Sequence, residues 1–190
     1  MTLGAIVLAG GCSRRMGRDK ALLPGSGGGT LLERQVALVR EAGADWIRIS
    51  VRAGQRYEGF EGLSLEDAWP GSGPLGGIAT ALGTHPGTHL LAVAVDLPNL
   101  SATLLREIWA ACEPGRGVAP CLPEGWEPLV AVYPIEAIGE AERRLRSGRL
   151  RMREFAVALS HAGRLREFPV GEEFRGAFKN WNAPADLVET

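Results

Sequence analysis

A glycine-rich, basic loop directly follows the first apolar segment of the chain. Residues 3–9 are apolar and predict a buried strand, and the sequence AGGCSRRMGRDK continues from Ala9 to Lys20. Adjacent glycines let a backbone approach a ligand and turn its N–H groups outward. The arginines and Lys20 add positive charge suited to phosphate groups. We therefore predict a site for a polyanion such as a triphosphate; a glycine turn with solvated arginines is the alternative.

The loop matches neither of two well-known phosphate-binding motifs. Lys20 is followed by Ala21, whereas the P-loop requires serine or threonine at that place. The glycines after the strand are consecutive and the next is Gly17, so the dinucleotide-binding pattern GxGxxG is also absent. Any phosphate site here is of a different kind.

A single aspartate ends the most apolar segment of the chain. Asp96 follows the run of residues 89–95 and precedes Leu97 and Pro98. Ligands of open α/β sheets bind at the carboxyl ends of the strands. A carboxylate there can hold Mg²⁺ between the protein and phosphate groups. A turn or helix N-cap role is the alternative for Asp96.

The elements that must position these residues alternate along the chain. Apolar runs predict strands at 3–9, 46–51, 89–95, 118–122, 129–133 and 165–170. Amphipathic stretches predict helices at 30–42, 74–82, 101–112, 135–146 and 150–161, with a last helix from Pro184. Thr30 and Glu33 form a capping-box pattern at the first helix. This order predicts an α/β sheet between helix layers, in a single domain over residues 1–190.

Composition narrows the class of protein. The chain is 45% hydrophobic and 23% charged with a net charge of −1, which gives no support to a general nucleic-acid or membrane-surface role. The three cysteines, Cys12, Cys112 and Cys121, are scattered. They argue against a disulfide framework or zinc site and for a reducing compartment. The sequence shows no leader-like start and no membrane-span window, so we expect a cytoplasmic protein.

Three stretches of the sequence resemble the motifs of a known family. LAGGCSRRMGRDK, residues 8–20, resembles the signature L-A-G-G-x-S-x-R-M-G-x-D-K of nucleotidyltransferases related to molybdenum cofactor guanylyltransferase, and every fixed position matches. VDLP at Asp96 is similar to the family's metal-binding D-x-P. Residues 65–78 resemble its acid followed by G-P-L-x-G-[IM], with Asp67, otherwise an ordinary loop acid, as the acid. The resemblance implies a three-layer Rossmann-like fold with a largely parallel, mixed sheet.

The resemblance also implies a reaction and the residues that perform it. The family transfers GMP from GTP to molybdopterin, with Mg²⁺, and releases pyrophosphate. Lys20, Arg15 and Asp96 would then be catalytic, with Asp96 the metal ligand. The implied nucleotide-binding residues are Leu8, Ala9, Gly10, Gly11, Ser13, Lys20, Ser50, Asp67 and Asp96. Molybdenum-insertion and apoenzyme-delivery proteins would be further partners.

One position departs from the family pattern. After the second strand the relatives often carry asparagine in N-x-N, and Ser50 stands at that place here. Serine keeps a hydroxyl donor and acceptor but lacks the reach of an amide. Two alternatives therefore stay open: the same chemistry with another nucleotide or acceptor, such as CTP, and a non-catalytic nucleotide-binding protein.

The carboxy-terminal half offers weaker signals. NWNAPADL resembles the family ending N-x-N-T-P-E-[DE]-L, which implies active-site roles for Asn180 and Asn182; capping of the last helix by Asn182 is the alternative. Six arginines between residues 143 and 153 form either a solvated helix face or a capture site for an anionic acceptor. His85 and His89 flank Pro86, which disfavours a helical two-histidine metal site, so we expect structural roles.

Overall fold

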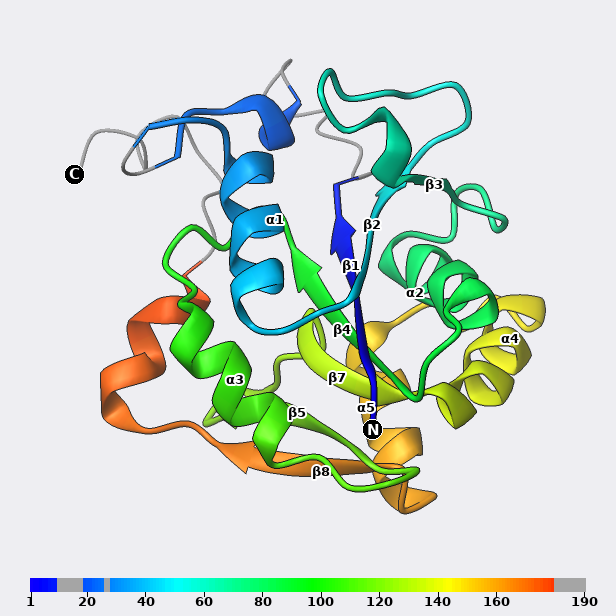
Figure 1. The fold of residues 1–190 in the computed structure, drawn as a ribbon. Coiled ribbons are helices and arrows are strands. Elements are labelled where there is room, and N and C mark those ends of the chain that lie inside the picture. The colour runs from blue at the N-terminus through cyan, green and yellow to red at the C-terminus, as the bar shows by residue number, and fades with distance from the viewer. Residues whose placement is uncertain (10–18, 26–27, 180–190) are drawn as a thin grey trace.

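A mixed sheet runs through the centre of the molecule in the computed structural model, which describes residues 1–9, 19–25 and 28–179 (Figure 1). The described residues form eight strands in the order β3-β2-β1-β4-β7-β5-β6, and β8 pairs with β5. The bounds are β1 Leu3–Leu8, β2 Trp46–Val51, β3 Ser64–Glu66, β4 His89–Ala94, β5 Gly117–Leu122, β6 Gly125–Trp126, β7 Val130–Pro134 and β8 Leu165–Pro169. Strands β3, β2, β1 and β4 are mutually parallel, as are β5 and β8, whereas β7 is antiparallel to β4 and β5. The predicted largely parallel, mixed sheet is confirmed.

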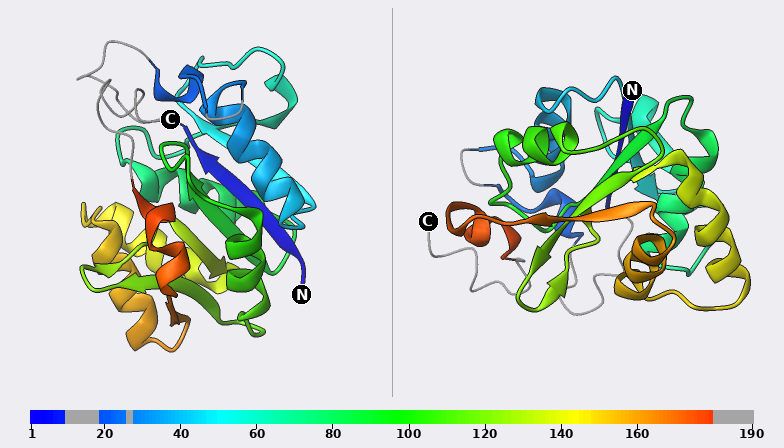
Figure 2. Two further views of the ribbon diagram at one scale, coloured as in Figure 1. Left: turned by 90° about the vertical axis from the view of Figure 1, so that its left-hand side faces the viewer. Right: turned by 90° about the horizontal axis from the view of Figure 1, so that it is seen from below.

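Helices cover both faces of this sheet (Figures 1 and 2). The α-helices are α1 Leu31–Glu41, α2 Pro74–Thr84, α3 Ala102–Ala110, α4 Ile138–Arg146 and α5 Met152–His161. The 3₁₀ helices are η1 Lys20–Leu22, η2 Glu61–Leu63, η3 Ile135–Ala137 and η4 Glu172–Phe178. Within β1, Ala5 and Val7 pack in one buried cluster with α1 and α3, while Ile6 packs in a second cluster with α2, α4 and α5. The alternation of side chains along the strands thus divides the core between two helix layers.

Local sequence explains the element boundaries that matter for the site. The Thr30 hydroxyl accepts a hydrogen bond from the Glu33 amide at 3.2 Å, and the Glu33 carboxylate accepts one from the Thr30 amide at 2.6 Å. This is the predicted capping box, and it begins α1. All six residues of β4 are buried, as expected for a central strand covered by helices on both faces.

Some elements were not predicted from the sequence. β3 and β6 contain three and two residues, too few for a period-2 pattern to be read. The 3₁₀ helix η4 was also missed. The helix predicted from Pro184 lies outside the described residues. No helix in the described part of the chain is long and apolar enough to cross a bilayer.

The two central histidines are packing residues. His89 is fully buried in β4, with Nδ1 3.0 Å from the Thr88 hydroxyl and Nε2 3.0 Å from the Glu113 carbonyl. His85 packs against Trp46, with ring centroids 5.1 Å apart. Within residues 1–9, 19–25 and 28–179, no cluster of three His, Cys, Asp or Glu side chains could hold a metal ion.

Candidate active site

A cavity of about 420 Å³ opens at the carboxyl ends of β1, β2 and β4. In Figure 1 the strands β1, β2 and β4 all run upward, so these ends lie on the same side of the sheet. Six of the residues implied to bind nucleotide line the cavity: Leu8, Ala9, Lys20, Ser50, Asp67 and Asp96. Residues far apart in sequence therefore meet where an open α/β sheet binds its ligands. The other implied site residues, Gly10, Gly11, Ser13, Arg15, Asn180 and Asn182, lie outside the described residues.

A cation and a carboxylate face each other in this cavity. The Lys20 Nζ lies 3.2 Å from an Asp96 carboxylate oxygen, and the side chains are 20% and 26% exposed. The contact joins η1 to the turn after β4. Asp96 does not cap α3, because Ser101 is the N-cap and its hydroxyl accepts from the Leu104 amide. The carboxylate of Asp96 is thus available to the cavity rather than committed to a helix end.

A buried network holds the turn that carries Lys20. One Asp19 oxygen accepts from the Ala21 amide at 3.0 Å. The other accepts from the Gln55 side-chain amide and from the Tyr57 hydroxyl, both at 2.9 Å. Burial, helped by the bond to Asp19, raises the pKa of Tyr57, so its phenol stays a neutral donor. Asp19 therefore anchors η1 to the segment that follows β2.

This anchor includes two residues that sequence reasoning missed. Gln55 and Tyr57 lie 36 and 38 positions after Asp19. Asp19 is a fixed position of the signature, which indicated that its side chain has a partner. Its partners depend on how the segment after β2 folds back, and no local pattern encodes that contact.

Two glycines of α2 let the helix approach the cavity wall. A Cβ atom on Gly76 would lie 2.6 Å from an Asp67 carboxylate oxygen, and one on Gly77 would lie 2.5 Å from the Ser50 hydroxyl. Such distances are too short for any side chain. Asp67 accepts hydrogen bonds from the Trp69 amide at 2.8 Å and the Thr80 hydroxyl at 3.2 Å, and burial raises its pKa. α2 thus fixes Asp67 and Ser50 at the cavity wall.

The donor set of the cavity suits a hard divalent cation. Asp96 offers carboxylate oxygens at the end of β4, whereas Asp67 follows β3 at the other end of the cavity. Magnesium is usually bound through one or two carboxylates together with substrate phosphates, and it needs no complete protein cage. The described residues therefore fit such an ion when a phosphorylated substrate supplies the remaining oxygens.

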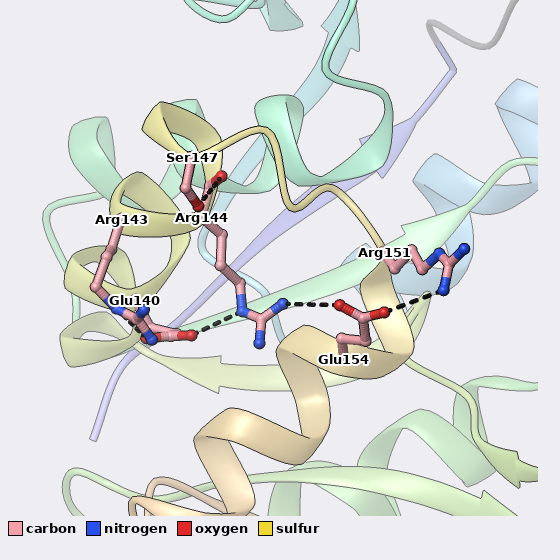
Figure 3. Close-up of polar contacts among 6 residues, drawn as sticks. All are labelled: Glu140, Arg143, Arg144, Ser147, Arg151 and Glu154. Atoms are coloured by element: carbon pink, nitrogen blue, oxygen red, sulfur yellow. Dashed lines mark hydrogen bonds and ion pairs between the residues drawn. The ribbon is translucent and has the colours of Figure 1, made fainter.

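The arginine run lies away from the cavity, and five of its six arginines pair with acids. Arg144 bridges Glu140 of α4, at 2.7 Å, and Glu154 of α5, at 3.6 Å (Figure 3). Arg143 also contacts Glu140, and Arg151 contacts Glu154 at 3.3 Å. Arg146 and Arg153 pair with Glu142 and Glu127. These pairings argue against capture of an acceptor phosphate; most of the arginines are solvated, as the first interpretation expects, whereas Arg144 is buried.

The fold and the cavity are those of an α/β nucleotide-binding enzyme, and the comparisons with known proteins agree. The model of the MobA-like NTP transferase domain matches residues 5–162. A relative named probable molybdenum cofactor guanylyltransferase, from Opitutus terrae, is 43% identical over 187 residues, covering 97% of this chain and 92% of that protein. The chain belongs to the MobA-like NTP transferase family, as predicted, and is a nucleotidyltransferase.

Solved structures share the fold. Molybdopterin-guanine dinucleotide biosynthesis protein A from Archaeoglobus fulgidus aligns with a TM-score of 0.72 at 25% identity, covering 97% of this chain and 94% of that one. The 2-C-methyl-D-erythritol 4-phosphate cytidylyltransferase from Thermus thermophilus aligns with a TM-score of 0.70 at 19% identity, covering 96% and 94%. The second likeness shows the fold alone. Together they confirm the predicted nucleotidyltransferase fold.

Proposed function

We propose that this chain transfers GMP from GTP to molybdopterin, producing molybdopterin guanine dinucleotide and pyrophosphate. The observation that carries the proposal is the pair of Lys20 and Asp96, 3.2 Å apart in a cavity at the strand ends. A cation and a carboxylate at this place suit a triphosphate and its metal ion. The names of the relatives supply the substrate class, because several are molybdenum cofactor guanylyltransferases.

Lys20 would bind phosphate oxygens of the nucleotide. The Lys20 and Asp96 side chains are both partly exposed to the cavity, so a phosphate can reach Lys20 there. Its charge would then offset the negative charge that builds on pyrophosphate as the bond to the α-phosphorus breaks. Arg15 would add a second cation, and the amides of Gly10 and Gly11, with Ser13, would complete the phosphate site.

Asp96 would hold Mg²⁺ at the end of β4. The ion would supply charge stabilisation at the α-phosphate. The acceptor of the transferred group is a phosphate oxygen of molybdopterin, which is ionised at neutral pH. It forms the new bond to the α-phosphorus while pyrophosphate leaves with the electron pair of the broken bond. Because the nucleophile is already an anion, the site requires no general base.

The remaining predictions concern the whole chain. We propose that residues 1–190 act as one nucleotidyltransferase domain, supported by a family match that spans residues 5–162 and by the continuous sheet. Active-site roles for Asn180 and Asn182, delivery-protein partners and a cytoplasmic location stay predictions.

A turnover assay tests the proposed function. Purified protein, Mg²⁺ and molybdopterin are incubated with GTP, CTP or ATP in separate reactions, and the dinucleotide product is measured. We expect product with GTP and little with CTP or ATP. Product with CTP would instead assign the chain to the cytidylyltransferase alternative. A protein that binds nucleotide but forms no product would contradict the proposed reaction.

A further inference from the structure

Arg52 lines the cavity and carries a guanidinium group that no described acid pairs with. It directly follows β2, is exposed and lines the cavity. Within residues 1–9, 19–25 and 28–179 its side chain makes no hydrogen bond or ion pair, and its charge acts on the Tyr57 phenol. Arg56, four residues further along the same segment, differs because it pairs with Glu66 at 2.8 Å. Arg52 therefore holds its donors ready for a ligand.

The backbone around Arg52 fixes where this group lies. Its amide donates to the Gln55 side-chain carbonyl at 3.2 Å, and the Val51 carbonyl accepts from the Asp67 amide at 3.0 Å. Side chains alternate along a strand, so Arg52 follows Ser50 on the face toward α2. Arg52 and Asp67 thus place a cation and a carboxylate at one end of the cavity.

Lys20 and Asp96 lie at the other end. Asp96 follows β4, Arg52 follows β2, and β1 lies between these strands in the sheet. Two strand spacings separate the ends by about 10 Å. A nucleoside triphosphate carries its phosphates and its base at opposite ends. With the phosphates at Lys20 and Asp96, the base falls beside Arg52 and Asp67.

We propose that Arg52 recognises the base of the nucleotide, donating two hydrogen bonds to O6 and N7 of guanine. This inference rests on the proposed function. Guanine presents these two acceptors side by side, in the geometry that the guanidinium fork matches. Adenine presents N7 beside an amino group, which is a donor. The guanidinium would then find one acceptor, and its second N–H would face another donor. Arg52 is then a specificity-determining residue.

The competing role is a contact with phosphate. A phosphate contact would act on every nucleoside triphosphate equally, because all share the same phosphates. A base contact would act only on nucleotides with acceptors at positions 6 and 7. The two roles therefore differ in a measurable pattern across nucleotides.

The test is the dissociation constant of the full-length protein, with Mg²⁺, for GTP, ITP, ATP, CTP and 7-deaza-GTP. We expect Arg52→Ala to raise the dissociation constants for GTP and ITP by about 5- to 100-fold. The dissociation constants for ATP and CTP should change by less than about twofold. Arg52→Lys keeps the charge but lacks the fork, so it should resemble Arg52→Ala. The loss with 7-deaza-GTP should be smaller, because one of the two acceptors is missing. Arg56→Ala removes the same charge from the same segment and should leave all five constants unchanged.

Three outcomes would overturn the inference. An equal loss for every nucleotide would make Arg52 a phosphate ligand, and unchanged GTP binding would give it no role. A wild-type preference for CTP over GTP would contradict guanine recognition. Each of these differs from failure of the proposed function, which would appear as a wild-type protein that binds no nucleotide or forms no dinucleotide product.

Discussion

The cations of the cavity and those of the α4–α5 surface are held in different ways. On α4 and α5 arginines pair with glutamates, as Arg144 does with Glu140 and Glu154 (Figure 3). In the cavity, Lys20 meets a carboxylate that is itself suited to bind metal, and Arg52 meets no described acid. The denser run of charge is paired with acids, and the sparser set is the one for which we propose a role in chemistry. The cavity cations and the α4–α5 arginines thus differ in their position in the fold rather than in the number of charges.

Removal of the cavity carboxylate should have the largest effect on activity. Asp96→Asn keeps the shape of the side chain but removes the charge that would hold Mg²⁺. We expect turnover to fall by about 10²–10³-fold, the range seen when one transition-state contact is lost. Steady-state kinetics across a range of Mg²⁺ concentrations measures this.

Glu154→Gln is the matched control for that variant. It also exchanges a carboxylate for an amide, but on the α4–α5 surface, and we expect turnover within about twofold of wild type. Full activity of Asp96→Asn with an intact fold would show that Asp96 is not the metal ligand. Carboxylates of the cavity and of the α4–α5 surface would then not differ in their effect on turnover.

Removal of the bridging arginine should affect stability and leave turnover intact. Arg144 is 8% exposed and contacts both Glu140 and Glu154. Arg144→Gln should lower the free energy of unfolding by about 1–3 kcal/mol, because two carboxylates lose a partly buried partner. Denaturant unfolding measures this loss. Arg146→Gln, whose arginine is 65% exposed, should cost less than about 1 kcal/mol. A large fall in kcat for Arg144→Gln would show that the surface takes part in catalysis.

Loss of the Tyr57 hydroxyl should make the position of Lys20 less well fixed, because Tyr57 donates to Asp19, which anchors the turn that carries Lys20. Tyr57→Phe removes one donor from Asp19 but keeps Gln55 as the other. The free energy of unfolding should fall by about 0.5–1.5 kcal/mol, the value of one hydrogen bond. We also expect a rise in KM for GTP with a smaller change in kcat, because Lys20 becomes less well positioned for the triphosphate. An unchanged KM would confine the network to a purely structural role.

The pH dependence of stability should be small and have a defined sign. Burial lowers the pKa values of His85 and His89, so the folded protein binds fewer protons than the unfolded chain in mildly acidic solution. Stability is then complete above the unfolded histidine pKa of about 6.5 and is lost as the pH falls through that value toward the lowered folded values. Urea unfolding between neutral and mildly acidic pH measures the slope. His85→Phe should flatten it, and a stability that rises on acidification would contradict this account.

Much of the sheet could be predicted because its signals are local. The apolar runs of β1, β2 and β4 and the capping box of α1 each depend on neighbouring residues. The positions of Lys20 and Asp96 follow from the rule that ligands bind at strand ends. Gln55, Tyr57 and Arg52 could not be assigned in this way, since their roles depend on the path of a loop after β2. The close approach of α2 likewise appears only when Gly76 and Gly77 are seen against Asp67 and Ser50.

The most direct test of the central claim is a crystal structure with a non-hydrolysable GTP analogue and Mg²⁺. The account predicts the triphosphate at Lys20, the metal ion at Asp96 and the guanine beside Arg52, with the α4–α5 surface free of nucleotide. A nucleotide bound outside the cavity, or one with its base at Lys20 and its phosphates at Arg52, would contradict it.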